Sequence, residues 1–377
     1  MQQINEVNDI DLSVPINSET YRELAREKID KKAFGYIDSG SGSEWSLVEN
    51  IKQYHRYSLV PRVLRDVTAV DQSITLLGRE IRAPYLLAPV GFQTIVHDDG
   101  ERASAQASNH AGIPFVQSTV SSYTIEEIRA ALPDAPHYFQ LYWPSDVEVC
   151  DSLIKRAEAS GVDALVITVD TPLLGRREVD LAHAYFPMET GAGMANFLSD
   201  PVFQAKYNPT GTLTESALKQ AIQKILFHPG LTFQALKKLR DETALPIIIK
   251  GVLNKDDAKE LQALGVDGII VSNHGGRQLD SAVAPLDVLA DVRAAVGPSF
   301  PLLVDGGVRR GSDIIKALAL GADAVLIGRP YIYGLIDGER GVRQVLSQLS
   351  SDLQTNLALL GVTDVSQLDQ SYIKNAE

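Results

Sequence analysis

The sequence has only one cysteine, Cys150, among its 377 residues, which excludes an intrachain disulfide and a cysteine-based metal cluster. We expect this thiol to be an inert packing residue, and we expect no metal site. No uninterrupted apolar segment approaches the roughly 20 residues that a membrane-spanning helix needs. The first residues are polar and acidic, unlike a signal peptide, and the last three are not a peroxisomal tripeptide. The prediction is a cytoplasmic protein.

Positive charge is also scarce. There are 35 lysines and arginines against 48 aspartates and glutamates, which gives a net charge of -13. This balance argues against nucleic acid or an anionic membrane as a partner. A hydrophobic content of 45% is enough for a large core. The length permits two or three domains, although α/β barrels of this size also occur as one domain.

A repeated unit organises the chain from Pro84 onward: a short apolar run, a polar or glycine-containing tip, then an amphipathic stretch such as 147–159 or 255–264. Eight apolar runs occur, at 85–90, 114–118, 138–142, 164–169, 246–249, 268–271, 301–304 and 324–327. Eight strand–helix units predict a single closed parallel (β/α)8 TIM barrel. A doubly wound open sheet is the alternative. We prefer the barrel because polar, chemically useful residues follow nearly every run, as at the mouth of a barrel.

Two further segments are expected around the barrel, which we place at 81–377. Residues 1–80 are predicted to be an N-terminal helical segment packed on it, with a helix at 21–31 and a glycine–serine turn at 34–42. The connection after the fourth run is unusually long. We predict that residues 178–230 form an insertion that acts as a lid. An oligomer contact or a simple insertion is the alternative.

The richest tip follows the sixth run and holds His274 and Arg277 beside two glycines. A neutral imidazole can take a proton near pH 7, and a guanidinium can hold a carboxylate through two hydrogen bonds. Alone, this stretch could equally be a loop with a surface histidine and a solvated arginine. However, Asp170 ends the fourth run, where it could orient the imidazole. Arg177 could share a substrate carboxylate with Arg277, assisted by Tyr36 and Tyr142. These residues predict a small 2-hydroxy acid as substrate.

The remaining tips predict a phosphorylated ring lying across the mouth. Glycine and arginine occur together after the last two runs, at 305–311 and 328–329, where backbone N–H groups, the start of a helix near Ser312 and two guanidinium groups could hold phosphate. Lys250 ends an otherwise apolar run and requires an anion or a polarised ring. Ser118, Gln140 and Thr168 could bind the edge of a ring that bears carbonyls and nitrogens. Flavin mononucleotide (FMN) fits this pattern, whereas the absence of an early Gly-x-Gly-x-x-Gly motif argues against a dinucleotide-binding domain.

Four of these stretches carry a family resemblance: SNHGGRQ at 272–278, DGGVRRG at 305–311, FQLY at 139–142 and TVDTP at 168–172. With them, the chain from about residue 36 to 360 resembles the FMN-dependent L-2-hydroxy-acid oxidases and dehydrogenases. The resemblance implies that His274 is the active-site base paired with Asp170, and that Lys250 stabilises negative charge on reduced flavin. It also implies a homotetramer or octamer. The implied FMN-binding residues are Ala88, Pro89, Val90, Ser118, Gln140, Thr168, Lys250, Ser272, Asp305, Gly306, Gly307, Arg309, Gly328 and Arg329.

Residues that differ among subfamilies lead to a more specific expectation about the reaction products. Gly91 stands where peroxide-forming members of the family usually carry alanine and lactate 2-monooxygenase carries glycine. The segment 195–204 is also similar to the monooxygenase, whereas 175–178 is closer to glycolate oxidase. We therefore expect oxidation of L-lactate with O2 to acetate, CO2 and water. The alternatives are an oxidase that releases H2O2, an FMN-dependent isomerase without net oxidation, and a non-catalytic ligand-binding barrel.

Overall fold

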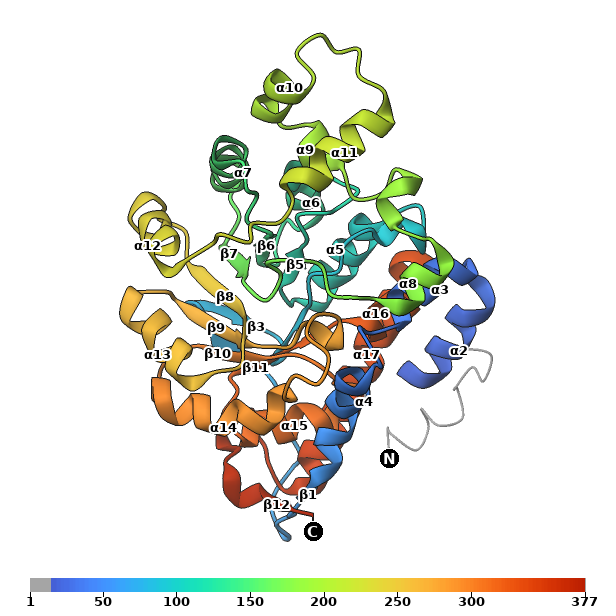
Figure 1. The fold of residues 1–377 in the computed structure, drawn as a ribbon. Coiled ribbons are helices and arrows are strands. Elements are labelled where there is room, and N and C mark those ends of the chain that lie inside the picture. The colour runs from blue at the N-terminus through green and yellow to red at the C-terminus, as the bar shows by residue number, and fades with distance from the viewer. Residues whose placement is uncertain (1–14, 377) are drawn as a thin grey trace.

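The computed structural model describes residues 15–376 and has at its centre a closed barrel of eight parallel strands surrounded by helices (Figure 1). The strands follow one another around the barrel in chain order, and β11 closes it against β4. The predicted TIM barrel is therefore confirmed, and the doubly wound sheet is excluded. The strands are β4 (Tyr85–Leu87), β5 (Phe115–Gln117), β6 (His137–Leu141), β7 (Ala164–Thr168), β8 (Ile247–Val252), β9 (Gly268–Val271), β10 (Leu302–Val304) and β11 (Ala324–Ile327).

The outer ring consists of helices that follow the strands. They are α5 (Gly100–Ala111), α6 (Ile125–Ala131), α7 (Val147–Ala159), α12 (Phe233–Glu242), α13 (Lys255–Leu264), α14 (Pro285–Val296), α15 (Gly311–Ala319), and the pair α16 (Arg329–Gly334) and α17 (Gly338–Leu360). Both amphipathic stretches singled out in the sequence are helices with the expected bounds. Asp146 and Asn254 cap them, because each side chain accepts a hydrogen bond from a backbone N–H of the first turn. Cys150 lies on the buried face of α7, where burial raises the pKa of its thiol, as expected of a packing residue.

Two apolar layers hold the barrel together. One lies between the strands and the helices. The other fills the barrel interior with inward-facing side chains from alternate strand positions, such as Leu86, Val116 and Ile248. The hairpin of β2 (Ile74–Leu76) and β3 (Arg79–Ile81) adds Leu76 and Ile81 to this interior cluster. The opposite end therefore remains the only open mouth among the described residues, and it is where the strands end in polar residues.

The N-terminal segment contains α2 (Ser18–Lys28), α3 (Lys31–Asp38), α4 (Trp45–Lys52) and the short 3-10 helix η2 (Gln53–Arg56). The predicted turn at 34–42 is wrong in its first half, because residues 31–38 form α3. Asp30 begins this helix by accepting hydrogen bonds from the N–H groups of Lys32 and Ala33, and Gly35 is tolerated within it. Tyr36 is therefore carried on a helix instead of a turn. β1 (Tyr57–Leu59) pairs antiparallel with β12 (Ile373–Asn375) and ties the two ends of the described chain together.

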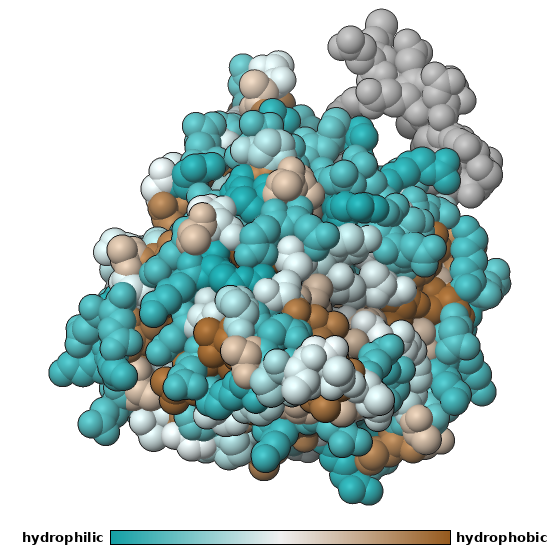
Figure 2. All heavy atoms as spheres, turned by 90° about the horizontal axis from the view of Figure 1, so that it is seen from above, coloured by the Kyte–Doolittle hydropathy of each residue, from teal (hydrophilic) through white to brown (hydrophobic). Residues whose placement is uncertain are grey.

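The long connection after β7 is itself mostly helical. It contains α8 (Glu178–His183), η4 (Pro187–Thr190), α9 (Ala195–Leu198), α10 (Pro201–Tyr207) and α11 (Glu215–Ile225). α8 packs against α3, so the connection meets the N-terminal segment beside α16, at the right of Figure 1. Figure 2, which views the molecule from above Figure 1, shows a mainly hydrophilic surface with small separate apolar patches. Among the described residues, no helix is long and apolar enough to cross a membrane.

Candidate active site

The site is assembled by the two-residue period of the strands. In each strand the inward-facing apolar residue is followed two positions later by a residue at the mouth, since successive side chains alternate between faces. Leu86 leads to Ala88 in this way, and Ile248 leads to Lys250. The eight positions reached are Ala88, Ser118, Gln140, Thr168, Lys250, Ser272, Asp305 and Gly328. Every one of them was predicted as a cofactor contact, so the fold brings these predicted residues together at one level.

Hydrogen bonds between neutral side chains connect the ends of β5, β6 and β7 at the mouth. Gln140 accepts from the Ser118 hydroxyl (3.2 Å) and donates through Nε2 to the Thr168 hydroxyl (3.1 Å). All three side chains are buried. The backbone N–H of Thr119, which can only donate, also bonds to Gln140 Oε1 (3.2 Å) and so fixes which end of the amide is the acceptor. The ends of these strands therefore present polar groups of fixed orientation to a ligand bound at the mouth.

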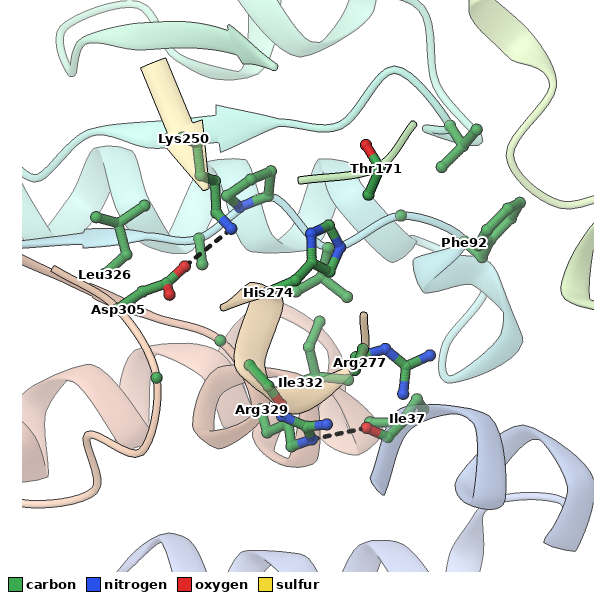
Figure 3. A pocket seen from close by; sticks show the side chains of 18 of the residues that line it. Ile37, Phe92, Thr171, Lys250, His274, Arg277, Asp305, Leu326, Arg329 and Ile332 are labelled. Carbon is green, nitrogen blue, oxygen red and sulfur yellow. Dashed lines mark hydrogen bonds and ion pairs between the residues drawn. The ribbon is translucent and has the colours of Figure 1, made fainter. Parts of the chain in front are cut away.

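Charged side chains lie at the ends of β8 and β10. The Lys250 ammonium lies 3.0 Å from Asp305 Oδ2 and donates to the Ser272 hydroxyl at 2.9 Å (Figure 3). Burial alone lowers the pKa of Lys250, but the Asp305 and Asp170 carboxylates raise it above the usual value, so the lysine is cationic. The second oxygen of Asp305 has no hydrogen-bond partner among the described residues. This buried acceptor is available to a hydroxyl of a bound molecule.

His274 lies between a carboxylate and a phenol. Its Nδ1 is 2.9 Å from Asp170 Oδ1, and its Nε2 is 3.3 Å from the Tyr142 hydroxyl. Because Asp170 is an acceptor, the neutral ring carries its proton on Nδ1, and Nε2 is an acceptor on the pocket side to which the Tyr142 hydroxyl donates. The backbone of His274 is left-handed (φ 60°), and its N–H is held by the Ser272 hydroxyl at 3.0 Å. Such strain in a residue with a side chain is typical of functional sites.

Electrostatics prepare this pair for proton transfer. Burial lowers the pKa of His274 below its ordinary value, and the Asp170 charge only partly offsets this effect. Burial would raise the pKa of Asp170, but the facing imidazole and Lys250 hold it below the usual range. At neutral pH the pair therefore consists of a neutral imidazole and an ionised carboxylate. This is the protonation state that a general base requires.

Two guanidinium groups flank the ring of Tyr36. The Arg277 guanidinium lies 4.7 Å and that of Arg177 5.8 Å from the ring centre. Burial and the neighbouring Arg177 lower the pKa of Arg277 to about 9, which reflects the cost of holding two cations together. Arg277 Nη2 has no acceptor among the described residues. The geometry can therefore bind an anion of carboxylate size.

The end of the mouth predicted for phosphate has free backbone donors. Gly306 and Gly307 follow one another with positive φ (93° and 86°), a conformation that glycine adopts without strain and in which no side chain covers the backbone N–H groups. No bond from these two N–H groups occurs within the described chain. By contrast, the N–H groups of residues 309–311 at the start of α15 already donate to Asp313 and Asp352. The glycine pair, together with arginine, is therefore the available cradle instead of the helix end.

Arg329 has a second use that the sequence did not indicate. Its guanidinium donates to the carbonyls of Ile37 (2.9 Å), Ser39 (2.8 Å) and Gly275 (3.1 Å). Figure 3 shows the bond to Ile37. Arg329 thus fastens the end of α3 and the His274 turn to the barrel. Two of its five N–H donors remain for an anion.

These residues fit FMN in charge and in donor set. A ring edge would meet the Lys250 ammonium and lie over the Gln140–Thr168 pair, a hydroxyl chain would meet the unpartnered oxygen of Asp305, and phosphate would meet Gly306–Gly307. The predicted residues that line the cavity are Tyr36, Ala88, Pro89, Val90, Tyr142, Arg177, Lys250, His274, Arg277, Asp305, Gly306, Gly307, Arg309, Gly328 and Arg329. Asp170, Ser118, Gln140, Thr168 and Ser272 are not among the lining residues. They contact lining residues or lie beneath the cavity.

The aromatic part of the cavity lining has no recognisable signal in the sequence. Phe92, Phe186 and Phe227 line the cavity, and Phe92 packs edge-on against both Tyr36 and Phe186. Phe186 and Phe227 belong to the long connection after β7, where nothing in the local pattern distinguishes a cavity-facing phenylalanine from a core one. The three phenylalanines give the cavity an apolar lining beside Tyr36 and Tyr142.

Comparison with known proteins places the chain among related flavoenzymes. Residues 25–375 match the family model described as FMN-dependent dehydrogenase. An L-lactate oxidase from Lysinibacillus sphaericus is 44% identical over 355 residues, which is 94% of this chain and 91% of that protein. A peroxisomal (S)-2-hydroxy-acid oxidase from Oryza sativa is 38% identical over 96% of each chain. A crystal structure of mandelate oxidase superposes with a TM-score of 0.85 at 36% identity, covering 96% of this chain and 98% of that one.

Proposed function

Since the chain belongs to the FMN-dependent dehydrogenase family and is an FMN-dependent 2-hydroxy-acid oxidoreductase, we propose that its substrate is a small L-2-hydroxy acid, with L-lactate the first candidate, and that O2 is its electron acceptor. One observation carries the proposal. The Nε2 acceptor of His274, which only the Tyr142 hydroxyl contacts among the described residues, lies in the same cavity as the two guanidinium groups around Tyr36. A hydroxy acid presents a proton and a carboxylate at matching positions.

Carboxylate binding comes first. Arg277 and Arg177 hold the substrate carboxylate, and the Tyr36 ring keeps the two guanidinium groups in place. Because Arg277 is buried with a cationic neighbour, an anion between them relieves repulsion and is bound strongly. Phe92, Phe186 and Phe227 line the same cavity and exclude water from it, which strengthens these charge interactions.

Proton transfer follows from the orientation of His274. Its Nε2 accepts a proton from the substrate, while Asp170 holds Nδ1–H and stabilises the imidazolium that forms. The Tyr142 hydroxyl, 3.3 Å from Nε2, positions the substrate hydroxyl beside that nitrogen. When bound, FMN supplies a two-electron acceptor. The Lys250 ammonium offsets the negative charge that develops at the mouth.

For the finer question of product, we propose the monooxygenase outcome: lactate and O2 yield acetate, CO2 and water. Gly91 supports it, since a side chain there is excluded by space. A Cβ on Gly91 would lie 2.4 Å from Val120 Cγ2 and 2.8 Å from the Val120 carbonyl oxygen. With glycine, the tips of β4 and β5 pack closely and help to confine the 2-oxo acid and peroxide long enough to react. An oxidase that releases pyruvate and H2O2 is the second candidate, favoured by the lactate oxidase relatives.

The test is an anaerobic titration of the purified holoenzyme with L-lactate, followed by the visible absorption of the flavin. Bleaching that reverses in air supports the proposal, and the H2O2 and acetate formed per lactate then separate the two outcomes. If lactate, glycolate and mandelate all leave the flavin oxidised, the substrate class is wrong and the isomerase alternative is favoured. The homotetramer or octamer, the cytoplasmic location and the lid role of 178–230 stay predictions.

A further inference from the structure

The tip of β4 is held from behind by a buried polar network. Ala88, Pro89, Val90 and Gly91 line the cavity. Beneath them, the Tyr331 hydroxyl donates to the Ala88 carbonyl at 2.8 Å, and Gln93 Nε2 donates to the Val90 carbonyl at 2.9 Å. Both supporting side chains are at most 1% exposed.

The neighbours of Gln93 fix the donor and acceptor roles of its side-chain amide, and its backbone N–H also has a partner. The second Nε2 hydrogen goes to the Tyr331 hydroxyl (3.1 Å), Oε1 accepts from the Ser104 hydroxyl (2.7 Å), and the backbone N–H donates to Glu101 Oε1 (3.0 Å). The amide therefore cannot be flipped without losing these bonds. The residue before it, Phe92, has a left-handed backbone (φ 61°) and is held by its N–H to the Val120 carbonyl at 3.0 Å. A strained turn is thus fixed at both ends.

The bond to the Val90 carbonyl has a consequence for the cavity. In a trans peptide, C=O and N–H point in opposite directions. Because Gln93 draws the Val90 oxygen down into the protein, the N–H of Gly91 points away from Gln93, on the side where Gly91 lines the cavity. That N–H has no acceptor among residues 15–376. The neighbouring bond differs, because the Ala88 carbonyl precedes proline and its peptide carries no N–H.

We propose that Gln93 is a positioning residue for the flavin: it orients the Val90–Gly91 peptide so that the Gly91 N–H donates to the isoalloxazine ring. Gln93 itself lies outside the cavity lining and acts only through this peptide. A donor aimed at the ring favours the reduced, more negatively charged flavin over the oxidised form. The inference rests on FMN as the cofactor and not on which hydroxy acid is oxidised.

The experiment compares Gln93→Met with Tyr331→Phe in FMN-loaded protein without substrate. Both variants remove a buried donor to a β4 carbonyl, but only the first frees a peptide that carries an N–H. Gln93→Met is expected to weaken the binding of reduced FMN about tenfold more than that of oxidised FMN, which converts to a fall of about 30 mV in the two-electron potential. Tyr331→Phe also removes one acceptor of Gln93 Nε2 but leaves the bond from Gln93 to the Val90 carbonyl in place, so its potential should fall by clearly less than that of Gln93→Met.

Equal potentials in all three proteins, or equal shifts in both variants, would overturn the proposal, since the network would then be general support for the strand. If Gln93→Met does not fold, as judged by thermal melting, Ser104→Ala replaces it. That variant loosens Gln93 through Oε1 alone, and a lowered potential supports the same assignment, whereas an unchanged potential overturns it. Failure of wild-type protein to bind FMN would instead contradict the site as a whole.

Discussion

At the scale of single residues, the strained backbone of His274 shows what the site is built to do. A left-handed residue with a side chain costs about 1–3 kcal/mol, and the turn is retained because it places the imidazole between Asp170 and Tyr142. We expect His274→Gln to lower the rate of flavin reduction by L-lactate by about 10²–10⁴-fold, since glutamine cannot accept the proton.

Anaerobic rapid mixing measures that rate directly. His110→Gln, on the half-exposed face of α5, is the matched control and should reduce its flavin at the wild-type rate. If His274→Gln also reduces flavin at the wild-type rate, the base has been assigned to the wrong residue.

Arg277 makes a second residue-scale prediction. Arg277→Lys keeps a cation but loses the planar fork, so kcat/KM for L-lactate should fall by roughly 10–100-fold. The loss should deepen as pH rises, because the burial that lowers the pKa of Arg277 also acts on an ammonium at that position. Propionate, which has the carboxylate without the hydroxyl, should weaken as an inhibitor by the same factor. Unchanged propionate inhibition would place the carboxylate elsewhere.

The buried carboxyl group of Glu101 makes the free energy of unfolding depend on pH. Burial raises its pKa to about 7, so the folded state holds this proton more tightly than the unfolded chain, in which the pKa is about 4.3. Its stabilising effect is complete below about pH 4 and is lost as pH rises through 7. In Glu101→Gln, the free energy of unfolding should therefore fall less steeply between pH 5 and 7, by up to about 1.4 kcal/mol per pH unit. Urea unfolding across this range tests it, and parallel curves for both proteins would contradict the assignment.

At the scale of elements, the strands were predictable and the helix that carries Tyr36 was not. β9 and β11 have the predicted bounds, because a buried parallel strand is a short apolar run ended by glycine or a polar residue. The same two-residue alternation predicted which tip residues share one level. α3 was missed because Gly35 and a following serine–glycine stretch resemble a turn. Its helical state depends on the Asp30 cap and on packing against α8 and α16.

Contacts between elements could not be predicted from the sequence, because they depend on how distant segments pack together. Arg329 was predicted to bind phosphate, but its bonds to the carbonyls of Ile37 and Ser39 depend on how the N-terminal segment packs on the barrel. Likewise, the capping of α15 by Asp352 joins residues about 40 positions apart. Local patterns carry no signal for such pairings.

The contact between the tips of β4 and β5 gives an element-scale prediction. Gly91→Ala should destabilise the protein by about 1–3 kcal/mol, because its methyl overlaps Val120. Adding Val120→Ala removes the nearer of the two overlapping atoms and should recover part of that loss. If the close packing confines peroxide, Gly91→Ala should also release more H2O2 per lactate.

Urea unfolding and a peroxide assay follow the two effects separately. Val120→Ala alone is the control for a change of volume without overlap. Additive free energies in the double variant would show that the two side chains do not meet, and unchanged peroxide release from Gly91→Ala would count against the monooxygenase proposal.

At the scale of the whole molecule, a chain with a net charge of -13 gathers cations at the mouth of its barrel. Arg177, Lys250, Arg277, Arg309 and Arg329 line one cavity. Burial lowers the pKa of Arg329, and Arg309 adds to this effect. When no anion is bound, the cationic side chains at the mouth repel one another, and they attract small acids. The overall acidity and the local basic cavity therefore favour a small anionic ligand over nucleic acid.

The same argument predicts how cofactors stabilise the fold. FMN at a hundred times its dissociation constant should stabilise the protein by about 2.7 kcal/mol, which raises the melting temperature by a few degrees. Riboflavin, which lacks the phosphate, should stabilise it much less at the same concentration, because the Gly306–Gly307 N–H groups and Arg309 then have no anion to bind. Thermal melts of the apoprotein with each ligand measure the difference. In Arg309→Gln the advantage of FMN over riboflavin should shrink while the riboflavin effect stays the same. Equal stabilisation of the wild type by both ligands would mean that phosphate does not bind at this end of the mouth.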